Sequence, residues 1–460
     1  MEYFKPPYPK PREGKTSLFG RVLSGWDSYL DLLSEYNYRM KIGHIKLPKM
    51  SFFILNERSL VKQVLKTAWE DFPKHRTMLD LLRPILGDNV FSRNGKDWEN
   101  LRKMMEGTLV YAKPENVFPL MSSAVTEMNN RFHTYQEGIP VDIDLEMTHV
   151  TADIIFRTTL SHTFTHKNAK DVYAAFKEFQ NCMQKQIMLS AYKLPTFYHR
   201  RKSEVLAENI RSLLTKIIKP RYESYINGTA QKYSDILAAL MEARDPNTGK
   251  SFSYDELIEH ISGVFLGGHE TTTASLIWSL YLIASCPHTQ KALQTEVDAI
   301  RNDILSFEDI KSLKTTRNVF REALRLYPPI GFLLREAAKE HCMLNEKIKT
   351  GDTVLISPWL IHRHREQWQD PDLFKPERFE DPASKESIQC SYLPFGEGPR
   401  MCPGQGFAQQ EALLIIATLI KNFQFSTVPG FAVKPVGRIT IRPKNGLKLI
   451  IHQRINKKEN

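Results

Sequence analysis

The chain has 460 residues, of which 42% are hydrophobic and 25% charged, with 22 glycines and 26 prolines. This composition is that of a folded globular protein, and it excludes a disordered or fibrous chain. The net charge is +11. Because basic and acidic residues are interleaved along the chain, the charge suits an acidic protein partner at least as well as a nucleic acid, and we expect no nucleic-acid binding.

The chain has no linker-like stretch and no repeat, so we expect a single domain over residues 1–460 and a monomer. The N-terminal stretch MEYFKPPYPKPREGK is rich in proline and charge. It lacks the continuous apolar run of a signal peptide or anchor, which predicts no stable membrane insertion and a cytoplasmic protein. The five cysteines have no CxxC spacing, which argues against a disulfide framework, a zinc ribbon and an iron–sulfur cluster.

The predicted elements are mostly helical. Residues 41–56 alternate like a β-hairpin. A long central helix is expected from a capping box at Ser253 and Glu256 to just before Pro287. A second helix is expected near 313–327, because Pro328 follows it. A strand near Val354, a helix from about Phe407 and a hairpin within 437–454 complete a mainly α chain with small β-sheets.

Cys402 lies in an unusual loop, FGEGPRMCPGQG, just ahead of the last predicted helix. The loop glycines remove side chains that would keep a flat ligand away, and they permit positive φ. Pro403 suits a first helical turn, and a helix N-terminus would lower the pKa of the thiol. The loop therefore favours a thiolate beneath a flat cofactor; the alternative is a buried, inert cysteine in a flexible loop.

The stretch Phe395, Gly398, Arg400, Cys402 and Gly404 matches the pattern Phe-x-x-Gly-x-Arg-x-Cys-x-Gly. In this respect the sequence resembles the cytochrome P450 superfamily of haem-thiolate monooxygenases, in its soluble bacterial-type form. The resemblance implies a large helical domain with haem b between the long central helix and the helix that follows the cysteine.

Further segments match the same family. Glu322 and Arg325 match its Glu-x-x-Arg pair, and Arg378 in PERF closes a Glu-Arg-Arg structural network. The resemblance implies that Cys402 is the iron ligand and that other residues contact the haem. These cofactor-binding residues are Trp98, Arg102, Arg335, Arg400, Phe395, Gly396, Gly404 and Gly267.

The segment GGHETT, residues 267–272, matches the oxygen-activating segment of the family's central helix. The resemblance implies that Glu270 and Thr271 deliver protons during dioxygen activation, as a hydrogen-bonded relay for general acid catalysis. It implies a monooxygenase that takes O2 and two electrons. A peroxide-driven peroxygenase and a non-catalytic haem sensor or carrier are the alternatives.

The sequence contains no nucleotide-binding fingerprint or cluster-binding cysteines, so electrons are expected from a separate donor. An acidic ferredoxin or flavodoxin with its reductase would suit the basic chain, docking near Lys96, Arg102 and Lys103. The expected substrate is a small hydrophobic molecule that undergoes hydroxylation or O-dealkylation. By analogy, its pocket residues are Phe265, Gly267, Gly268, Ile330, Phe332, Leu333 and Ile439.

Overall fold

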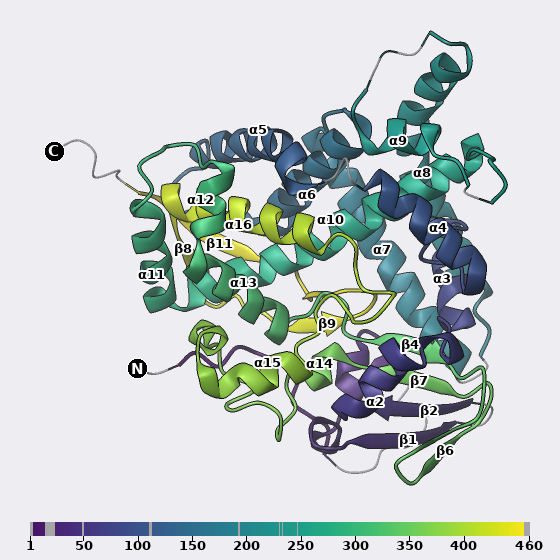
Figure 1. Cartoon of the computed structure of the whole chain (residues 1–460). Coiled ribbons are helices and arrows are strands. Elements are labelled where there is room, and N and C mark those ends of the chain that lie inside the picture. Colours follow the sequence, from purple (N-terminus) through teal and green to yellow (C-terminus); the bar gives the residue numbers. More distant parts are fainter. Residues whose placement is uncertain are drawn as a thin grey trace.

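Helix α10 (Tyr254–Ser285), the longest helix in the described part of the chain, runs through the middle of the molecule (Figure 1). It begins at the predicted capping box: the Glu256 N–H donates to the Ser253 hydroxyl, and the Ser253 N–H donates to the Glu256 carboxylate. It ends just before Pro287, where α11 begins. The predicted central helix is thus confirmed at both ends, because a cap and a proline define them.

This computed structural model describes residues 3–13, 24–47, 50–109, 113–191, 194–229, 231, 233–245 and 247–454. The other helices are α2 (Arg58–Lys62), α3 (Arg76–Leu86), α4 (Gly95–Thr108), α5 (Pro114–His133), α6 (Ile143–Leu160), α7 (His166–Ala191), α8 (Phe197–Ile226), α9 (Ile236–Glu242), α11 (Pro287–Asp298), α12 (Phe307–Ser312), α13 (Lys314–Leu326), α14 (Pro358–Ile361), α15 (Lys385–Ser391) and α16 (Gln405–Asn422). The predictions of α13 and of a helix after Cys402 are confirmed. None of the described helices is both long and apolar enough to cross a bilayer.

The strands form four small sheets. They are β1 (Ile42–Leu47), β2 (Met50–Leu55), β3 (Pro140–Asp142), β4 (Leu333–Glu336), β5 (His341–Met343), β6 (Glu346–Ile348), β7 (Thr353–Ile356), β8 (Phe423–Thr427), β9 (Pro435–Gly437), β10 (Ile441–Pro443) and β11 (Lys448–Gln453). The largest sheet has the order β1-β2-β7-β4, and β2 pairs in parallel with β7. It lies at one end of the helical body (Figure 1).

The predicted hairpin over 41–56 is confirmed as the antiparallel pair β1 and β2, although its turn at 48–49 lies outside the described residues. The predicted strand near Val354 is confirmed as β7. The hairpin predicted within 437–454 is wrong. Its first strand, β10, pairs with β9, whereas β11 pairs with β3 and β8. The two strands of the predicted hairpin pair with other strands and not with each other. Alternation of apolar and polar residues predicts a strand but not its partner.

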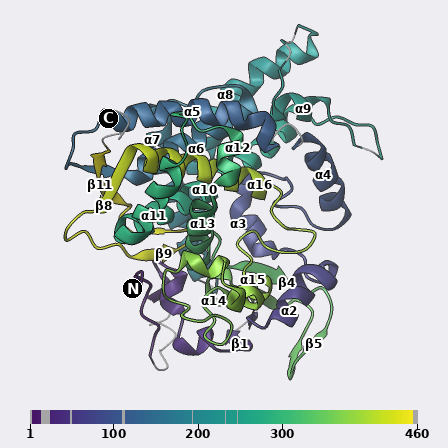
Figure 2. The same cartoon turned by 60° about the vertical axis from the view of Figure 1, so that its left-hand side comes forward.

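Helix α10 is the centre of the core. It packs against α6, α13 and α16 and lies among them in Figure 2. Trp278 of α10 stacks on Tyr327 with ring centroids 3.8 Å apart, and its indole N–H donates to the carbonyl of Ile441. Burial of such large rings contributes about 2 kcal/mol or more each. The helical body with small sheets matches the predicted fold class, while the single-domain and monomer predictions stay predictions.

Candidate active site

The cysteine loop folds as a tight turn ahead of α16. The Cys402 N–H donates to the carbonyl of Phe395 at 2.9 Å. Gly396 and Gly398 have φ of 76° and 75°, which few residues with a Cβ adopt. A Cβ at Gly398 would also collide with the carbonyl of Leu65. Two of the loop glycines are therefore needed by the backbone itself.

One detail of the predicted loop is wrong, and a second is outweighed by burial. Pro403 lies outside the helix, because α16 begins at Gln405 with Gly404 as its N-cap. Burial raises the pKa of the Cys402 thiol, although the Gly404 N–H and the Arg102 charge act in the opposite direction. In the protein alone, desolvation outweighs the helix N-terminus, and a positive charge beside the sulfur would favour the thiolate.

Helix α10 presents a strip of half-buried residues between its buried positions. The strip consists of Val264, Gly267, Gly268 and Thr271, which share one helical face. The Thr271 hydroxyl donates to the carbonyl of Gly267 at 2.7 Å. A Cβ at Gly267 would lie only 3.1 Å from the ring of Phe91. The strip therefore carries no side chain larger than valine, and neighbouring side chains come close to its glycines.

Four cations gather near the cysteine loop: Lys74, Arg102, Arg335 and Arg400. Arg400 donates to the carbonyls of Trp69 and Phe72, yet its Nε and that of Arg335 are buried without a partner among the described residues. Burial and the charges of Arg400, Arg335 and Arg102 lower the pKa of Lys74 to about 6. Such a cluster is incomplete without anions.

Two tryptophans line the same cluster. Trp98 of α4 is buried and meets Trp69 edge to face, with ring centroids 5.4 Å apart. The Arg400 guanidinium lies 4.8 Å from the centre of the Trp69 ring and 5.3 Å from that of Trp98. Arg102, one turn after Trp98, donates to the carbonyl of Met401 beside the cysteine and pairs with Glu106. The structure thus places Trp98 and Arg102 at the loop.

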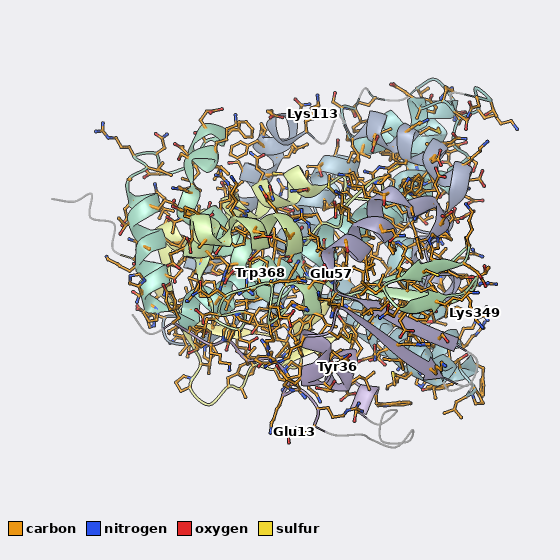
Figure 3. The ribbon with its side chains drawn as sticks, turned by 60° about the horizontal axis from the view of Figure 1, so that its bottom comes forward. Glu13, Tyr36, Glu57, Lys113, Lys349 and Trp368 are labelled. Carbon is orange, nitrogen blue, oxygen red and sulfur yellow. The ribbon has the colours of Figure 1, made fainter. Side chains whose placement is uncertain are left out.

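The predicted network of Glu322, Arg325 and Arg378 is present and buried. Both oxygens of Glu322 accept from Arg325 at 2.8 Å, and one also accepts from Arg378 at 2.9 Å. Burial alone would raise the pKa of Glu322, but the two guanidinium charges outweigh it and lower the pKa. Trp368, labelled in Figure 3, lies beneath Arg325.

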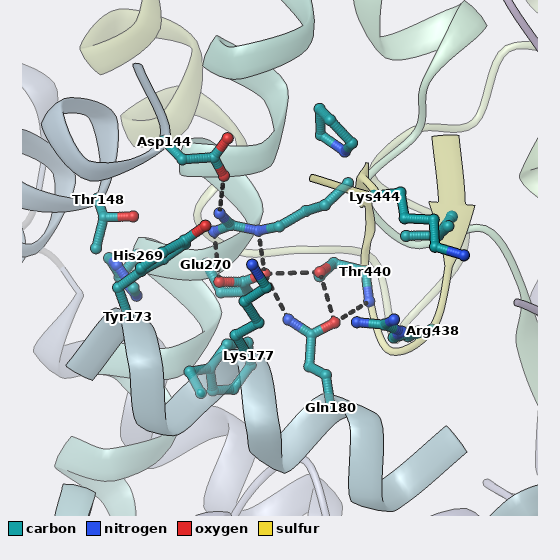
Figure 4. A pocket seen from close by; sticks show the side chains of 14 residues that line it. Asp144, Thr148, Tyr173, Lys177, Gln180, His269, Glu270, Arg438, Thr440 and Lys444 are labelled. Carbon is teal, nitrogen blue, oxygen red and sulfur yellow. Dashed lines mark hydrogen bonds and ion pairs between the residues drawn. The ribbon is translucent and has the colours of Figure 1, made fainter. Parts of the chain in front are cut away.

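Glu270 lies in a separate polar cluster with side chains from α7 and from the C-terminal segment (Figure 4). Its carboxylate accepts two hydrogen bonds from Arg442, at 2.6 and 2.8 Å, and others from Thr440 and Gln180. Arg442 also pairs with Asp144. These residues line a small cavity of about 30 Å³. The sequence had given no sign that Arg442, near the C-terminus, would hold this carboxylate.

A comparison with known families shows which protein family has these features. The family model for Cytochrome P450 matches residues 6–449, nearly the whole chain. The chain is a cytochrome P450. It is 28% identical to Cytochrome P450 CYP72A613 of Trigonella foenum-graecum, over 87% of this chain and 78% of that protein.

Other relatives of this cytochrome P450 are also plant proteins. It is 28% identical to cytokinin hydroxylase of Arabidopsis thaliana, over 92% of this chain and 82% of the relative. It is 28% identical to Protein LUTEIN DEFICIENT 5, chloroplastic, of the same plant, over 97% of this chain and 77% of the relative. The predicted family and fold are confirmed, while the soluble bacterial-type form stays a prediction.

Cytochromes P450 bind haem b through a cysteine thiolate, and the residues of this cytochrome P450 fit that group. Cys402 offers the thiol, and the iron would supply a positive charge beside the sulfur. The two carboxylates of haem would supply the anions that the cation cluster requires. Lys74 is a member of the cluster that sequence analysis missed. Only the fold shows its position, because it lies far along the chain from the cysteine motif.

The predicted substrate residues do not all lie together. Ile330, Phe332, Leu333 and Ile439 are half-buried, as the strip on α10 is. Ile439 and Val264 pack against the same apolar core. Phe265 is buried among Phe156, Phe164 and His269. The structure therefore does not bring Phe265 to that strip, because it lies on a different face of α10.

Replacing Lys74 by methionine is expected to have opposite effects on the haem-free and haem-loaded protein. The pKa of Lys74 is about 6 in the folded chain and 10.5 in the unfolded chain. Between these values the unfolded chain binds one more proton, so the presence of Lys74 destabilises the haem-free fold, most strongly at low pH. Haem carboxylates would reverse this effect by pairing with the ammonium group.

The haem-free K74M protein should therefore unfold at higher denaturant concentration than the original. The difference should shrink by about 1.4 kcal/mol per pH unit as the pH rises above 6. The loaded variant should lose haem to an acceptor protein about tenfold faster, since a charged hydrogen bond is worth about 1.5–3 kcal/mol. Lys96→Met, at an exposed position, is the control. If the K74M protein keeps haem as well as the original does, Lys74 does not bind the haem carboxylates.

Proposed function

We propose that this cytochrome P450 inserts one oxygen atom of O2 into a C–H bond of a small, mostly hydrophobic organic molecule. The observation that carries the proposal is the half-exposed strip of α10, which has apolar neighbours and no bulky side chain. Such a surface suits an apolar substrate held beside the cofactor. The printed name of one relative, cytokinin hydroxylase, supports hydroxylation. O-dealkylation begins with the same C–H attack and is included in the proposal.

The chain's own residues divide the work. Cys402 would hold the iron, and Lys74, Arg102, Arg335 and Arg400 would bind the haem carboxylates. The haem supplies the oxygen-activating and electron-accepting chemistry when bound. The Thr271 hydroxyl lies on the half-exposed strip of α10 and donates to the carbonyl of Gly267. From this position we propose that it passes on a proton. Glu270, the expected acid, must leave Arg442 before it can carry a proton.

The proposal is tested with isotopic oxygen. Hydrophobic compounds that shift the haem spin state are incubated with an electron donor under labelled O2, and the products are analysed by mass spectrometry. Incorporation of one labelled atom supports the proposal. Product formation from hydrogen peroxide alone, without labelled O2 in the product, would instead favour a peroxygenase. Binding spectra with no product under either condition would favour a sensor or carrier.

The electron donor is proposed to be a separate acidic protein, such as a ferredoxin or flavodoxin. A concavity of about 480 Å³ opens beside Cys402 and is lined in part by Arg102, Glu106, Lys113 and Met401. Lys96 and Lys103 are exposed on the neighbouring helix α4, and Lys113 is labelled in Figure 3. Lysines around an opening beside the iron ligand suit an acidic surface.

Replacing both Lys96 and Lys103 by glutamate is expected to slow haem reduction by an acidic donor. The loss should be about tenfold or more at low ionic strength and small at high salt, because exposed charges are screened. Stopped-flow reduction at several salt concentrations measures it. The double change K216E/K219E on α8 is the control, since it alters the net charge equally. Equal slowing by both variants would place the docking surface elsewhere.

The predicted cytoplasmic location stays a prediction.

A further inference from the structure

Tyr29 lies between two chain segments that contribute predicted pocket residues. It begins a short 3₁₀ helix, η1 (Tyr29–Leu32), whose N-cap is Ser28. The Ser28 hydroxyl accepts a hydrogen bond at 2.9 Å from the N–H of Gly437, the last residue of β9. The start of η1 is therefore fastened to β9, just ahead of the predicted pocket residue Ile439.

Two glycines make room for the Tyr29 side chain. A Cβ at Gly437 would lie 2.6 Å from its ring, and a Cβ at Gly331 would collide with its hydroxyl oxygen. Gly331 stands between the predicted pocket residues Ile330 and Phe332. The Phe332 ring meets the Tyr29 ring edge to face, with centroids 4.8 Å apart. Tyr29 thus brings a phenol hydroxyl to the wall of the predicted pocket.

The Tyr29 hydroxyl is buried and has no hydrogen-bond partner among the described residues. Backbone groups beside it already have partners of their own. The carbonyl of Gly331 accepts from the Ser357 hydroxyl at 2.8 Å and also from the N–H of Trp359. The end of the Ile441 side chain lies close to the same glycine, and the Ile441 carbonyl accepts the indole hydrogen bond described above. These groups therefore leave the phenol hydroxyl unpaired.

An unpaired hydroxyl in this position needs a reason. Its burial is unfavourable, and phenylalanine would fill the same space without that cost. Burial raises the pKa of Tyr29 well above its usual value, and no charged side chain of the described residues contributes to that shift. The group is therefore a neutral O–H donor beside apolar side chains. It suits an uncharged oxygen atom, because a carboxylate there would be buried without a positive partner.

We propose that Tyr29 determines substrate specificity by donating a hydrogen bond to an uncharged oxygen atom of the substrate. The substrate class is then a mostly hydrophobic molecule with an ether, ketone or alcohol oxygen, since a pure hydrocarbon leaves the phenol unpaired. The Phe332 ring and the end of the Ile441 side chain lie close to the hydroxyl and shift when the substrate enters. The inference rests on the proposed function, which supplies the small hydrophobic substrate.

The first measurement needs no substrate. Tyr29→Phe removes only the unpaired hydroxyl, so the haem-loaded variant should unfold at the same or a higher denaturant concentration than the original. Tyr36→Phe is the control, because Tyr36 is 67% exposed in the same part of the chain and its change should be neutral. A clear fall of the midpoint in Tyr29→Phe alone would overturn the proposal, since the hydroxyl would then have a partner within the protein.

The second measurement compares two probes that differ by one group. Methoxynaphthalene has an ether oxygen where ethylnaphthalene, substituted at the same ring position, has a methylene group. Dissociation constants are taken from the spin-state shift of the haem. Tyr29→Phe should weaken binding of the ether about fivefold, the scale of one neutral hydrogen bond, and should not weaken binding of the hydrocarbon. Tyr36→Phe should change neither constant.

A ketone and an alcohol, each with its hydrocarbon analogue, serve as two further pairs of probes. They allow for a probe that binds in another orientation. The proposal is overturned if Tyr29→Phe changes the two members of all three pairs equally, because the hydroxyl would then not contact the substrate.

The site of oxidation gives a further readout that a merely structural role would not move. In Tyr29→Phe the ether probe should be oxidised at more positions than in the original, with unchanged haem content, because its orientation is no longer fixed. Failure of the proposed function is a separate result. In that case the unaltered enzyme would give no labelled product, while the difference in binding between ether and hydrocarbon would still report on Tyr29.

Discussion

Replacing Cys402 by serine is expected to abolish thiolate ligation and with it the oxygenase activity. Serine keeps the size of the side chain and the Cys402 N–H bond to Phe395, so the loop should still form. A serine hydroxyl stays protonated at neutral pH and does not replace the electron-rich sulfur. The reduced protein with carbon monoxide should lose the strongly red-shifted Soret band, and turnover should fall below detection.

The matched control for this variant is Cys342→Ser. Cys342 is exposed on strand β5, far along the chain from the cysteine loop. Its spectrum and activity should equal those of the original protein. A red-shifted band that survives in Cys402→Ser would mean that another cysteine ligates the iron, and the loop would need another explanation.

Replacing Glu322 by alanine is expected to cost about 3–5 kcal/mol of folding free energy, the scale for breaking a buried pair from one side. The change strands Arg325 and Arg378, which are both buried and both donate to this carboxylate. The neighbouring backbone carbonyls of His362, Pro371 and Leu373 accept from Arg325 but carry no full charge to balance it. We expect little soluble protein and no retained haem, measured by denaturant unfolding and by the haem-to-protein absorbance ratio.

Glu308→Ala provides a control with the same spacing. Glu308 and Lys311 are also three residues apart on a helix, but their side chains are 78% and 54% exposed. Exposed pairs contribute about 0–1 kcal/mol, so this variant should fold and bind haem normally. Comparable losses in both variants would show that burial of the Glu322 network is not what matters.

Local signals predicted the main helices well. The capping box at Ser253 and the proline at 287 fixed α10, because caps and prolines act on the residues next to them. The cysteine motif and the Glu322 network were also recognisable from short patterns. The hairpin near the C-terminus failed because strand pairing depends on what else lies beside each strand.

The rest of the site depends on contacts that no local pattern contains. Lys74 and Arg335 form an isolated β-bridge, which brings two cations together from distant parts of the chain. Arg442 reaches Glu270 only because β10 folds back against α10. Phe265 was misplaced because the analogy with the family assigns a segment of the central helix to the pocket and does not say which face of α10 each residue occupies.

The parallel pairing of β2 with β7 has a consequence for synthesis of the protein. The N-terminal hairpin leaves the ribosome long before β7, and at about 5–20 residues per second the wait is on the order of tens of seconds. During that time β2, which contains Phe53 and Leu55, pairs with β1 on one edge and has no partner on the other edge. The unpaired backbone N–H and C=O groups of such an edge can form hydrogen bonds with strands of other nascent chains. The protein should therefore depend on chaperones while it is being made, and haem can be loaded only after its last third has emerged.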